Sequence, residues 1–183
     1  MVYILLAPGF EEAEALVPAD VLRRAGVDVA LTGLFGAAVP GSHSVTVSAD
    51  TTVEQVTLVP GDMVMIPGGP GYARVEECEA ALRLVRQAAE DPTMWLAAIC
   101  AAPTILARMG LLNGKQAVCY PGMEDALAEN NCTPCMDCSV VRDGQIITGR
   151  APGSAFDFAL ALTEVLAGQD MADRLREDMH YHS

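Results

Sequence analysis

The chain is poor in basic residues and has no long hydrophobic run. Its 183 residues include 11 lysines and arginines against 24 acidic residues, which gives a formal net charge of -13 at pH 7. Proteins that bind nucleic acids or anionic membranes use Lys and Arg to neutralise phosphates, so we expect neither partner. No apolar run approaches the ~18 residues that a membrane-spanning helix needs. The acidic balance is compatible with a small or neutral substrate.

Secretory signals, internal repeats, low-complexity segments and linkers are also missing. The chain begins with the apolar stretch 1–6, without the basic region and cleavage site of a signal peptide. We therefore expect a cytoplasmic protein, in which cysteines are more often reduced, catalytic or metal-binding than paired in disulfides.

What the chain does contain is enough apolar material for a core. Hydrophobic residues make up 51% and charged residues 19%, so disorder and coiled coil are excluded. At roughly 100–200 residues per domain, residues 1–183 are expected to form a single domain.

Short apolar runs alternate with amphipathic helical stretches along the chain. Strands are predicted at 2–7, 27–32, 63–66, 94–99 and 117–119, with a hairpin of 139–142 and 145–148 turning at Asp143-Gly144. Helices are predicted from about 11 to 25, where Pro18 should kink the helix or leave a carbonyl unpaired, and at 76–90, 103–109, 123–129, 154–166 and 171–179. Residues 39–56 indicate a small β-excursion. This order predicts a three-layer α/β/α sandwich with a mainly parallel sheet.

Unusual residues follow three of the predicted strands, at 8–14, 67–71 and 100–103. Functional sites of open α/β sheets lie at the carboxyl ends of the strands. We therefore expect these three segments to share one crevice.

Cys100 is the strongest catalytic candidate. An apolar strand delivers it directly to a helix start, which is the arrangement of a nucleophile elbow, although the usual elbow glycines are missing. A thiol at a helix N-terminus is expected to have a lowered pKa. The alternative is an ordinary buried cysteine, a common state of free thiols.

Two further features could complete a site around this cysteine. Gly68 and Gly69 could present backbone N–H groups to an oxyanion, or they could form a plain tight turn. Glu14 is the acid of the first helix expected to point inward, since Ala13 and Ala15 flank it. A carboxyl buried near a thiolate would have a raised pKa and could donate a hydrogen bond to the sulfur.

Cys132, Cys135 and Cys138 form two overlapping C-x-x-C pairs. They are weak candidates for a zinc or iron–sulfur site that would need a fourth ligand, such as Cys119, from another element. Reduced thiols or an adventitious disulfide are the alternative. The histidines, His43, His180 and His182, are not placed by sequence to serve the cysteine, which argues against a Cys–His hydrolase.

Four motifs in order along the chain resemble the ThiJ/PfpI superfamily, in the branch of the Parkinsonism-associated deglycase and its small bacterial relatives. They are Ala7-Pro8-Gly9-Phe10-Glu11-Glu12-Ala13-Glu14, Ile66-Pro67-Gly68-Gly69, Ala97-Ala98-Ile99-Cys100-Ala101-Ala102-Pro103, and the segment from Gly149 to Ala159. The resemblance covers nearly the whole chain and implies a flavodoxin-like sandwich that forms homodimers and uses no cofactor.

The resemblance also implies residue roles. Cys100 would be the reactive, oxidation-prone cysteine, and Glu14 the protonated carboxyl bonded to it. Gly68, Gly69 and Ala101 would supply backbone amides, and Arg150 would help to bind oxyanions. Tyr120 stands where many family members carry a histidine. A tyrosine is a poor general base near neutral pH, which makes peptidase activity improbable.

These observations favour a cysteine-dependent stress-protection enzyme acting on a small carbonyl substrate. Cys100 would add to methylglyoxal or its early adducts, and Glu14 would shuttle a proton during rearrangement to lactate, as in a glyoxalase or deglycase. The alternative is a non-enzymatic redox sensor, or a redox-regulated holdase chaperone, in which Cys100 stops at sulfenic or sulfinic acid.

Overall fold

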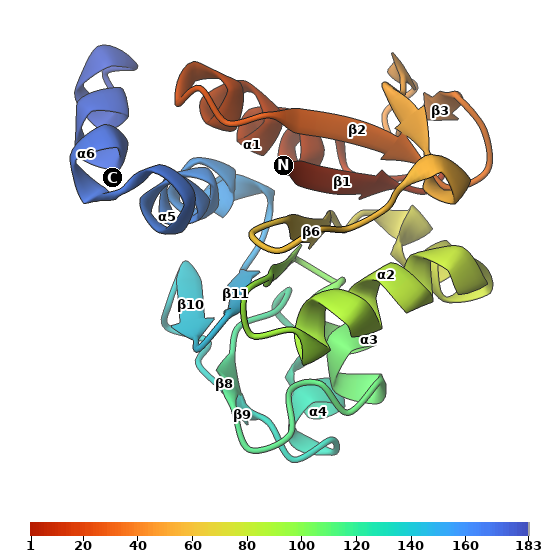
Figure 1. Ribbon diagram of the computed structural model, residues 1–183. Helices are drawn as coiled ribbons and strands as arrows, with labels where there is room; N and C mark the ends of the chain where they lie inside the picture. The colour runs from red at the N-terminus through yellow and green to blue at the C-terminus, as the bar shows by residue number, and fades with distance from the viewer. Residues whose placement is uncertain (183) are drawn as a thin grey trace.

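The computed structural model describes residues 1–182, and a seven-stranded sheet forms its centre (Figure 1). The sheet order is β10-β11-β7-β6-β1-β2-β5. The strands span β1 Val2–Leu6, β2 Val29–Gly33, β5 Thr51–Thr52, β6 Met63–Ile66, β7 Trp95–Ile99, β10 Val140–Asp143 and β11 Ile146–Gly149. Neighbouring strands pair in parallel except in the antiparallel hairpin β10–β11. The predicted mainly parallel, flavodoxin-like α/β fold is confirmed.

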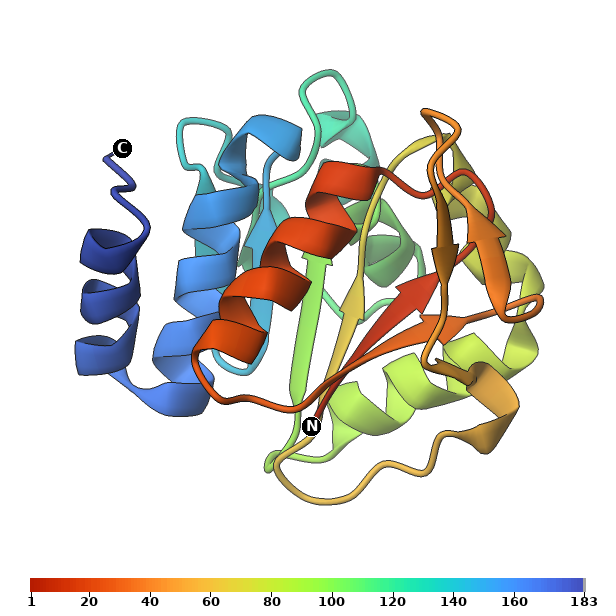
Figure 2. The ribbon, with the colours of Figure 1, turned by 90° about the horizontal axis from the view of Figure 1, so that it is seen from above.

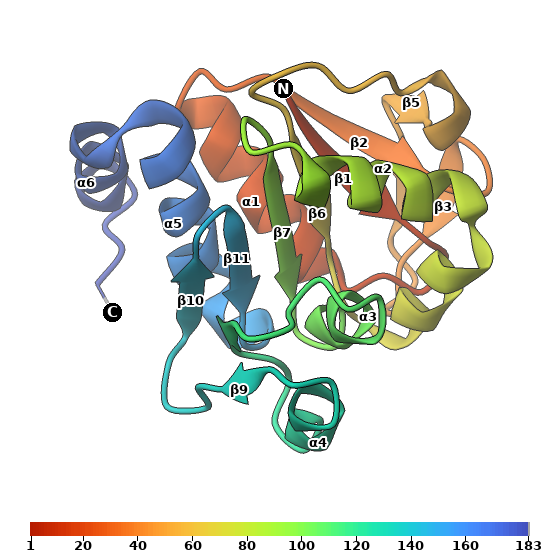
Figure 3. The same ribbon diagram turned by 60° about the horizontal axis from the view of Figure 1, so that its bottom comes forward.

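Helices cover both faces of this sheet. On one face α1 (Glu12–Arg24) packs against α5 (Ala155–Ala167), and α6 (Gln169–Asp178) lies outside α5 (Figure 2). On the other face lie α2 (Glu79–Glu90) and α3 (Pro103–Arg108), with α4 (Glu124–Ala128) packed against α3 (Figure 3). The sheet is therefore buried on both sides, which explains why β6 and the other central strands read as continuous apolar runs.

Three short 3-10 segments interrupt the connections: η1 Val53–Gln55, η2 Pro70–Glu77 and η3 Pro152–Ser154. The helix predicted at 76–90 is shorter than expected, because Cys78 is extended and separates η2 from α2. Helix α1 continues through Pro18, whose missing N–H leaves the carbonyl of Glu14 without its usual helical donor.

The strand elements outside the central core depart furthest from expectation. The β-excursion is a hairpin of β3 (Ala38–Pro40) and β4 (Thr46–Ser48), followed by β5, which joins the main sheet beside β2. The strand predicted at 117–119 is instead β8 (Gln116–Ala117), which pairs with β9 (Thr133–Pro134) in a separate small sheet. Local apolar content predicted a strand at this point but could not identify its partner.

The β10–β11 turn is shifted by one residue from the prediction. Asp143 pairs with Ile146, so the turn residues are Gly144 and Gln145, and Gly144 has a φ of 63°. None of the helices within residues 1–182 has both the length and the hydrophobicity needed to cross a bilayer.

Candidate active site

The segments that follow β1, β6 and β7 meet at the carboxyl edge of the sheet. They surround a cavity of about 370 Å³ lined by Glu11, Gly69, Pro70, Tyr72, Cys100, Ala101, Tyr120 and Pro152. The expectation that these three strand ends share one crevice is confirmed.

Cys100 sits in a sharp turn between β7 and α3. Its φ is 66°, a left-handed conformation that costs a non-glycine residue on the order of 1–3 kcal/mol. Two backbone hydrogen bonds hold it there: the Cys100 N–H donates to Gly149 O at 2.9 Å, and the Tyr120 N–H donates to Cys100 O at 2.7 Å. The side chain is 7% exposed and contacts the cavity. This strained turn is the elbow expected from the sequence.

Glu14 lies in the first turn of α1 and is completely buried. Its Oε2 accepts the N–H of Gly68 at 2.8 Å. Its Oε1 has no hydrogen-bond partner at ordinary distance and angle among residues 1–182, although the carboxyl as a whole lies against the Cys100 thiol. A buried carboxyl with one oxygen unsatisfied is arranged to carry a proton.

Burial controls the ionisation of both members of this pair. It raises the pKa of Glu14 to about 7, although the hydrogen bonds of Cys100 and Gly68 lower it. Burial, followed by the negative charge of Glu14, raises the pKa of Cys100 to about 12, although the N–H groups of Gly69 and Ala101 lower it. The lowered thiol pKa expected from a helix N-terminus is therefore wrong, because α3 begins only at Pro103 and burial outweighs it.

Because Glu14 and Cys100 are in contact, the loss of a proton from one group changes the pKa of the other, and the pair loses its two protons in two coupled steps. The first proton is lost near pH 7, mainly from the carboxyl, so that the remaining proton is mainly on the sulfur and only a minor fraction of the pairs has a neutral acid and a thiolate. The form with a neutral acid and a thiolate is the reactive one.

Gly68 is a spacer between the acid and the thiol. A Cβ at this position would lie 2.7 Å from Cys100 Cβ, 2.8 Å from Glu14 Oε2 and 3.0 Å from Cys100 Sγ. The Gly68 N–H is already used by Glu14, so the expected oxyanion role does not fit it. The N–H groups that face the sulfur are those of Gly69 and Ala101.

Tyr120 and Arg150 differ in their placement. Tyr120 lines the cavity and is 45% exposed. Arg150 follows β11 and is not among the residues that line the cavity. The backbone hydrogen bond of Gly122, with a smaller contribution from the charge of Arg150, lowers the pKa of Glu124. The backbone N–H of Arg150 donates to Ser139 O at 3.0 Å.

The cysteines around β9 are spread from interior to surface. Cys132 is buried, Cys135 half-buried and Cys138 exposed. Within residues 1–182, only Glu11, Glu12 and His43 bring three metal-binding side chains within 4.8 Å of one another. The three cysteines therefore do not gather around one point as a metal site would require.

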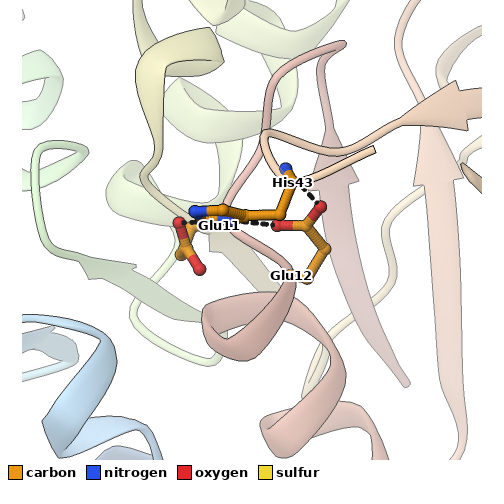
Figure 4. Close-up of side chains that lie close together, drawn as sticks. All are labelled: Glu11, Glu12 and His43. Atoms are coloured by element: carbon orange, nitrogen blue, oxygen red, sulfur yellow. Dashed lines mark hydrogen bonds and ion pairs between the residues drawn. The ribbon is translucent and has the colours of Figure 1, made fainter. Parts of the chain in front are cut away.

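His43 is the residue near the cavity that the sequence did not indicate. It lies on the loop between β3 and β4 and points toward Glu11 and Glu12 at the start of α1 (Figure 4). Hydrogen bonding to Glu12, followed by the charges of Glu11 and Glu12, raises the His43 pKa. Although burial raises the pKa of Glu12, hydrogen bonds led by that of His43 lower it to about 2. Only the tertiary fold brings these residues together.

Comparison with known proteins identifies the family. Residues 1–165 match the DJ-1/PfpI family. The Drosophila melanogaster protein dj-1beta is 40% identical, with 96% of this chain and 94% of that protein covered. A glutathione-independent glyoxalase of Caenorhabditis elegans is 32% identical, covering 94% and 91% of the two chains. A deglycase of Pyrococcus abyssi is 30% identical, covering 90% and 98%.

The fold agrees with the sequence match. The crystal structure of Drosophila melanogaster DJ-1beta superposes with a TM-score of 0.93 at 40% identity, over 100% of this chain and 98% of that one. The arrangement of a central sheet flanked by helices is thus a known architecture.

Proposed function

The chain belongs to the DJ-1/PfpI family, and we propose that it is a cysteine-dependent enzyme that converts methylglyoxal, or its early adducts on amines and thiols, into lactate. The buried contact between Cys100 and Glu14 at the wall of a small cavity carries this proposal. Relatives named glyoxalase and deglycase support the same chemistry.

The first step joins the substrate to the cysteine. The Cys100 thiolate adds to the aldehyde carbon, and Glu14 gives its proton to the aldehyde oxygen, which leaves a hemithioacetal and a carboxylate. The N–H groups of Gly69 and Ala101 face the sulfur, so they are placed to bind the oxygen while it is negatively charged.

The second step moves hydrogen within the substrate. The Glu14 carboxylate removes the proton from the carbon bonded to sulfur, giving an enediolate with its negative charge on the oxygen of the neighbouring carbon. Glu14 then returns the proton to that neighbouring carbon. The hydroxyl proton of the sulfur-bonded carbon passes to the negatively charged oxygen as the carbonyl of a lactoyl thioester forms. Water then cleaves the C–S bond, releasing lactate and regenerating Cys100. The net reaction adds one water to methylglyoxal and needs no external oxidant or reductant.

The test is lactate formation from methylglyoxal without added glutathione. Removing the nucleophile in Cys100→Ala is expected to lower the rate at least about a thousandfold. Cys138→Ala is the matched control, since Cys138 is an exposed cysteine outside the cavity, and its rate should equal that of the wild type. Equal rates for Cys100→Ala and Cys138→Ala would overturn the proposal.

A second function, redox sensing, is favoured by the N–H groups of Gly69 and Ala101 that point at the sulfur. They could bind the oxygens of a cysteine sulfinic acid formed from the thiol and two molecules of hydrogen peroxide, with release of two waters. Intact-mass analysis after mild peroxide treatment tests it. The expected gain of two oxygen atoms should localise to Cys100, and oxidation of Cys135 or Cys138 instead would contradict it.

A further inference from the structure

A cluster of polar side chains that includes Glu11, a residue of the cavity wall, is not used in the proposed reaction. Glu11 and Glu12 stand at the start of α1, and Ser42 and His43 lie on the loop between β3 and β4. Figure 4 shows His43 beside the two glutamates. We propose that Glu11, Glu12 and His43 bind one divalent transition-metal ion of the zinc type, and that the Ser42 hydroxyl is its fourth ligand.

Four candidate ligand atoms lie close to one another in this cluster. His43 Nδ1 lies 3.0 Å from Glu12 Oε2 and 3.6 Å from Glu11 Oε2. Ser42 Oγ lies 2.9 Å from His43 Nδ1, 3.0 Å from Glu12 Oε2 and 3.1 Å from Glu11 Oε2. Glu11 and Glu12 offer oxygens within 4.8 Å of each other. Five of the six pairs among these atoms are thus 2.9–3.6 Å apart.

The separations within this cluster suit a zinc ion. Zinc binds nitrogen and oxygen ligands at about 2.0–2.2 Å, so ligands at the corners of a regular tetrahedron are roughly 3.3–3.6 Å apart. The observed separations of 2.9–3.6 Å require most ligands to move outward by only a few tenths of an ångström.

The backbone holds the two segments together independently of an ion. The Ser42 N–H donates to Phe10 O at 2.9 Å, and Phe10 forms a β-bridge with Gly41. The His43 N–H donates to Glu12 Oε1 at 2.7 Å, which leaves Oε2 of the same carboxylate facing the other ligands. Such outer hydrogen bonds orient the ligands of metal sites.

Burial and donor type both favour a transition metal. The Glu11 and Glu12 side chains are 16% and 12% exposed, whereas His43 is 72% exposed and closes the cluster from the solvent side. Two carboxylates with a neutral imidazole carry two negative charges, which match a divalent cation. An imidazole ligand suits zinc and its neighbours, whereas magnesium and calcium prefer oxygen ligands alone.

The experiment uses the full chain with its thiols reduced, titrated with Co²⁺ as a spectroscopic probe and then with Zn²⁺ in competition. One equivalent of Co²⁺ is expected to give the visible absorption of a four-coordinate nitrogen and oxygen site, and Zn²⁺ should displace it. A thiolate-to-cobalt charge-transfer band is expected to be absent, because no sulfur belongs to the proposed site.

The variants are His43→Ala and Glu12→Gln, with His180→Asn as the matched histidine control. Asparagine tolerates the φ of 53° at position 180. Affinity should fall at least about tenfold in the first two variants and stay unchanged in the third. Thermal unfolding without metal verifies that each variant is folded.

Three results would overturn the proposal. One is equal affinity in His43→Ala and His180→Asn, and another is a charge-transfer band that assigns the metal to cysteine. The third is absence of binding in the folded wild type, which would make the cluster a hydrogen-bonded ion pair only. None of these results depends on lactate formation, so the metal site can fail while the proposed function stands.

Discussion

The N–H of Gly68 donates to Oε2 of Glu14 at 2.8 Å, so this glycine, which lies close to Cys100 in space, holds the Glu14 carboxyl in position. A Cβ on Gly68 would lie within 2.7 Å of Cys100 Cβ and 2.8 Å of Glu14 Oε2. The contact between acid and thiol therefore depends on the missing side chain at position 68.

Gly68→Ala should separate the two groups. Insertion of one methyl group into this packed site is expected to destabilise the chain by about 1–3 kcal/mol. Misplacement of the reacting groups should lower lactate formation by about a hundredfold. Urea unfolding and the methylglyoxal assay measure the two effects. Gly153→Ala is the control, because a Cβ there meets nothing within 4 Å, and equal behaviour of the two variants would contradict the steric argument.

The rate of Cys100 alkylation by iodoacetamide should depend on the pKa of the pair. In the wild type the rate should rise through about pH 7 and then level off, because the pair loses its first proton there and a constant fraction carries the charge on sulfur. Alkylation is followed by mass spectrometry of the peptide that contains Cys100.

Glu14→Gln converts this pair into a single titrating thiol. Burial keeps the pKa of that thiol above its ordinary value, so the plateau near pH 7 should disappear and the rate should keep rising into the alkaline range. An unchanged plateau in Glu14→Gln would show that Glu14 does not share the proton.

Glu14 also makes stability depend on pH. Its pKa is about 7 in the folded chain and near 4.5 when unfolded, so the folded chain holds this proton more tightly. The stabilisation is complete below pH 4.5 and is lost as pH rises through about 7. Glu14→Gln is permanently neutral and should gain about 3 kcal/mol relative to the wild type between about pH 4 and about pH 8. Urea unfolding of both proteins across this range measures the difference, and a constant difference would contradict the raised pKa.

Tyr120→Phe isolates the hydroxyl of the tyrosine that lines the cavity. The backbone N–H that donates to Cys100 O is retained, so the elbow should stay in place. Loss of a hydrogen bond to substrate should lower kcat/KM roughly fivefold to tenfold. Tyr181→Phe, in the tail beyond α6, is the control, and an unchanged kcat/KM in Tyr120→Phe would remove the hydroxyl from the reaction.

The core of the fold was predictable because it rests on local patterns. Continuous apolar runs predicted β1, β6 and β7, and these strands are buried on both faces as parallel strands require. Pairing partners were less predictable. The apolar run 117–119 reads as a strand, yet the pairing of β8 with β9 depends on a chain reversal through α4.

The site was predictable where one residue's position in its element decided its role. Cys100 follows a buried strand, and the alanines beside Glu14 indicated its inward direction. The pKa of Cys100 was mispredicted because helix position is local, whereas burial depends on the whole fold. No local signal joins His43 to Glu12, 31 residues away in sequence, because the β3–β4 hairpin brings them together.

The most direct measurement for the central claim is a single turnover of methylglyoxal with the enzyme in excess, quenched in acid over time. Mass spectrometry then follows the Cys100 peptide while lactate is measured in the same samples. We expect an acid-stable increase equal to one methylglyoxal molecule on Cys100, which forms before lactate and decays as lactate appears. Formation of lactate at the full rate while Cys100 remains an unmodified thiol throughout would contradict the account.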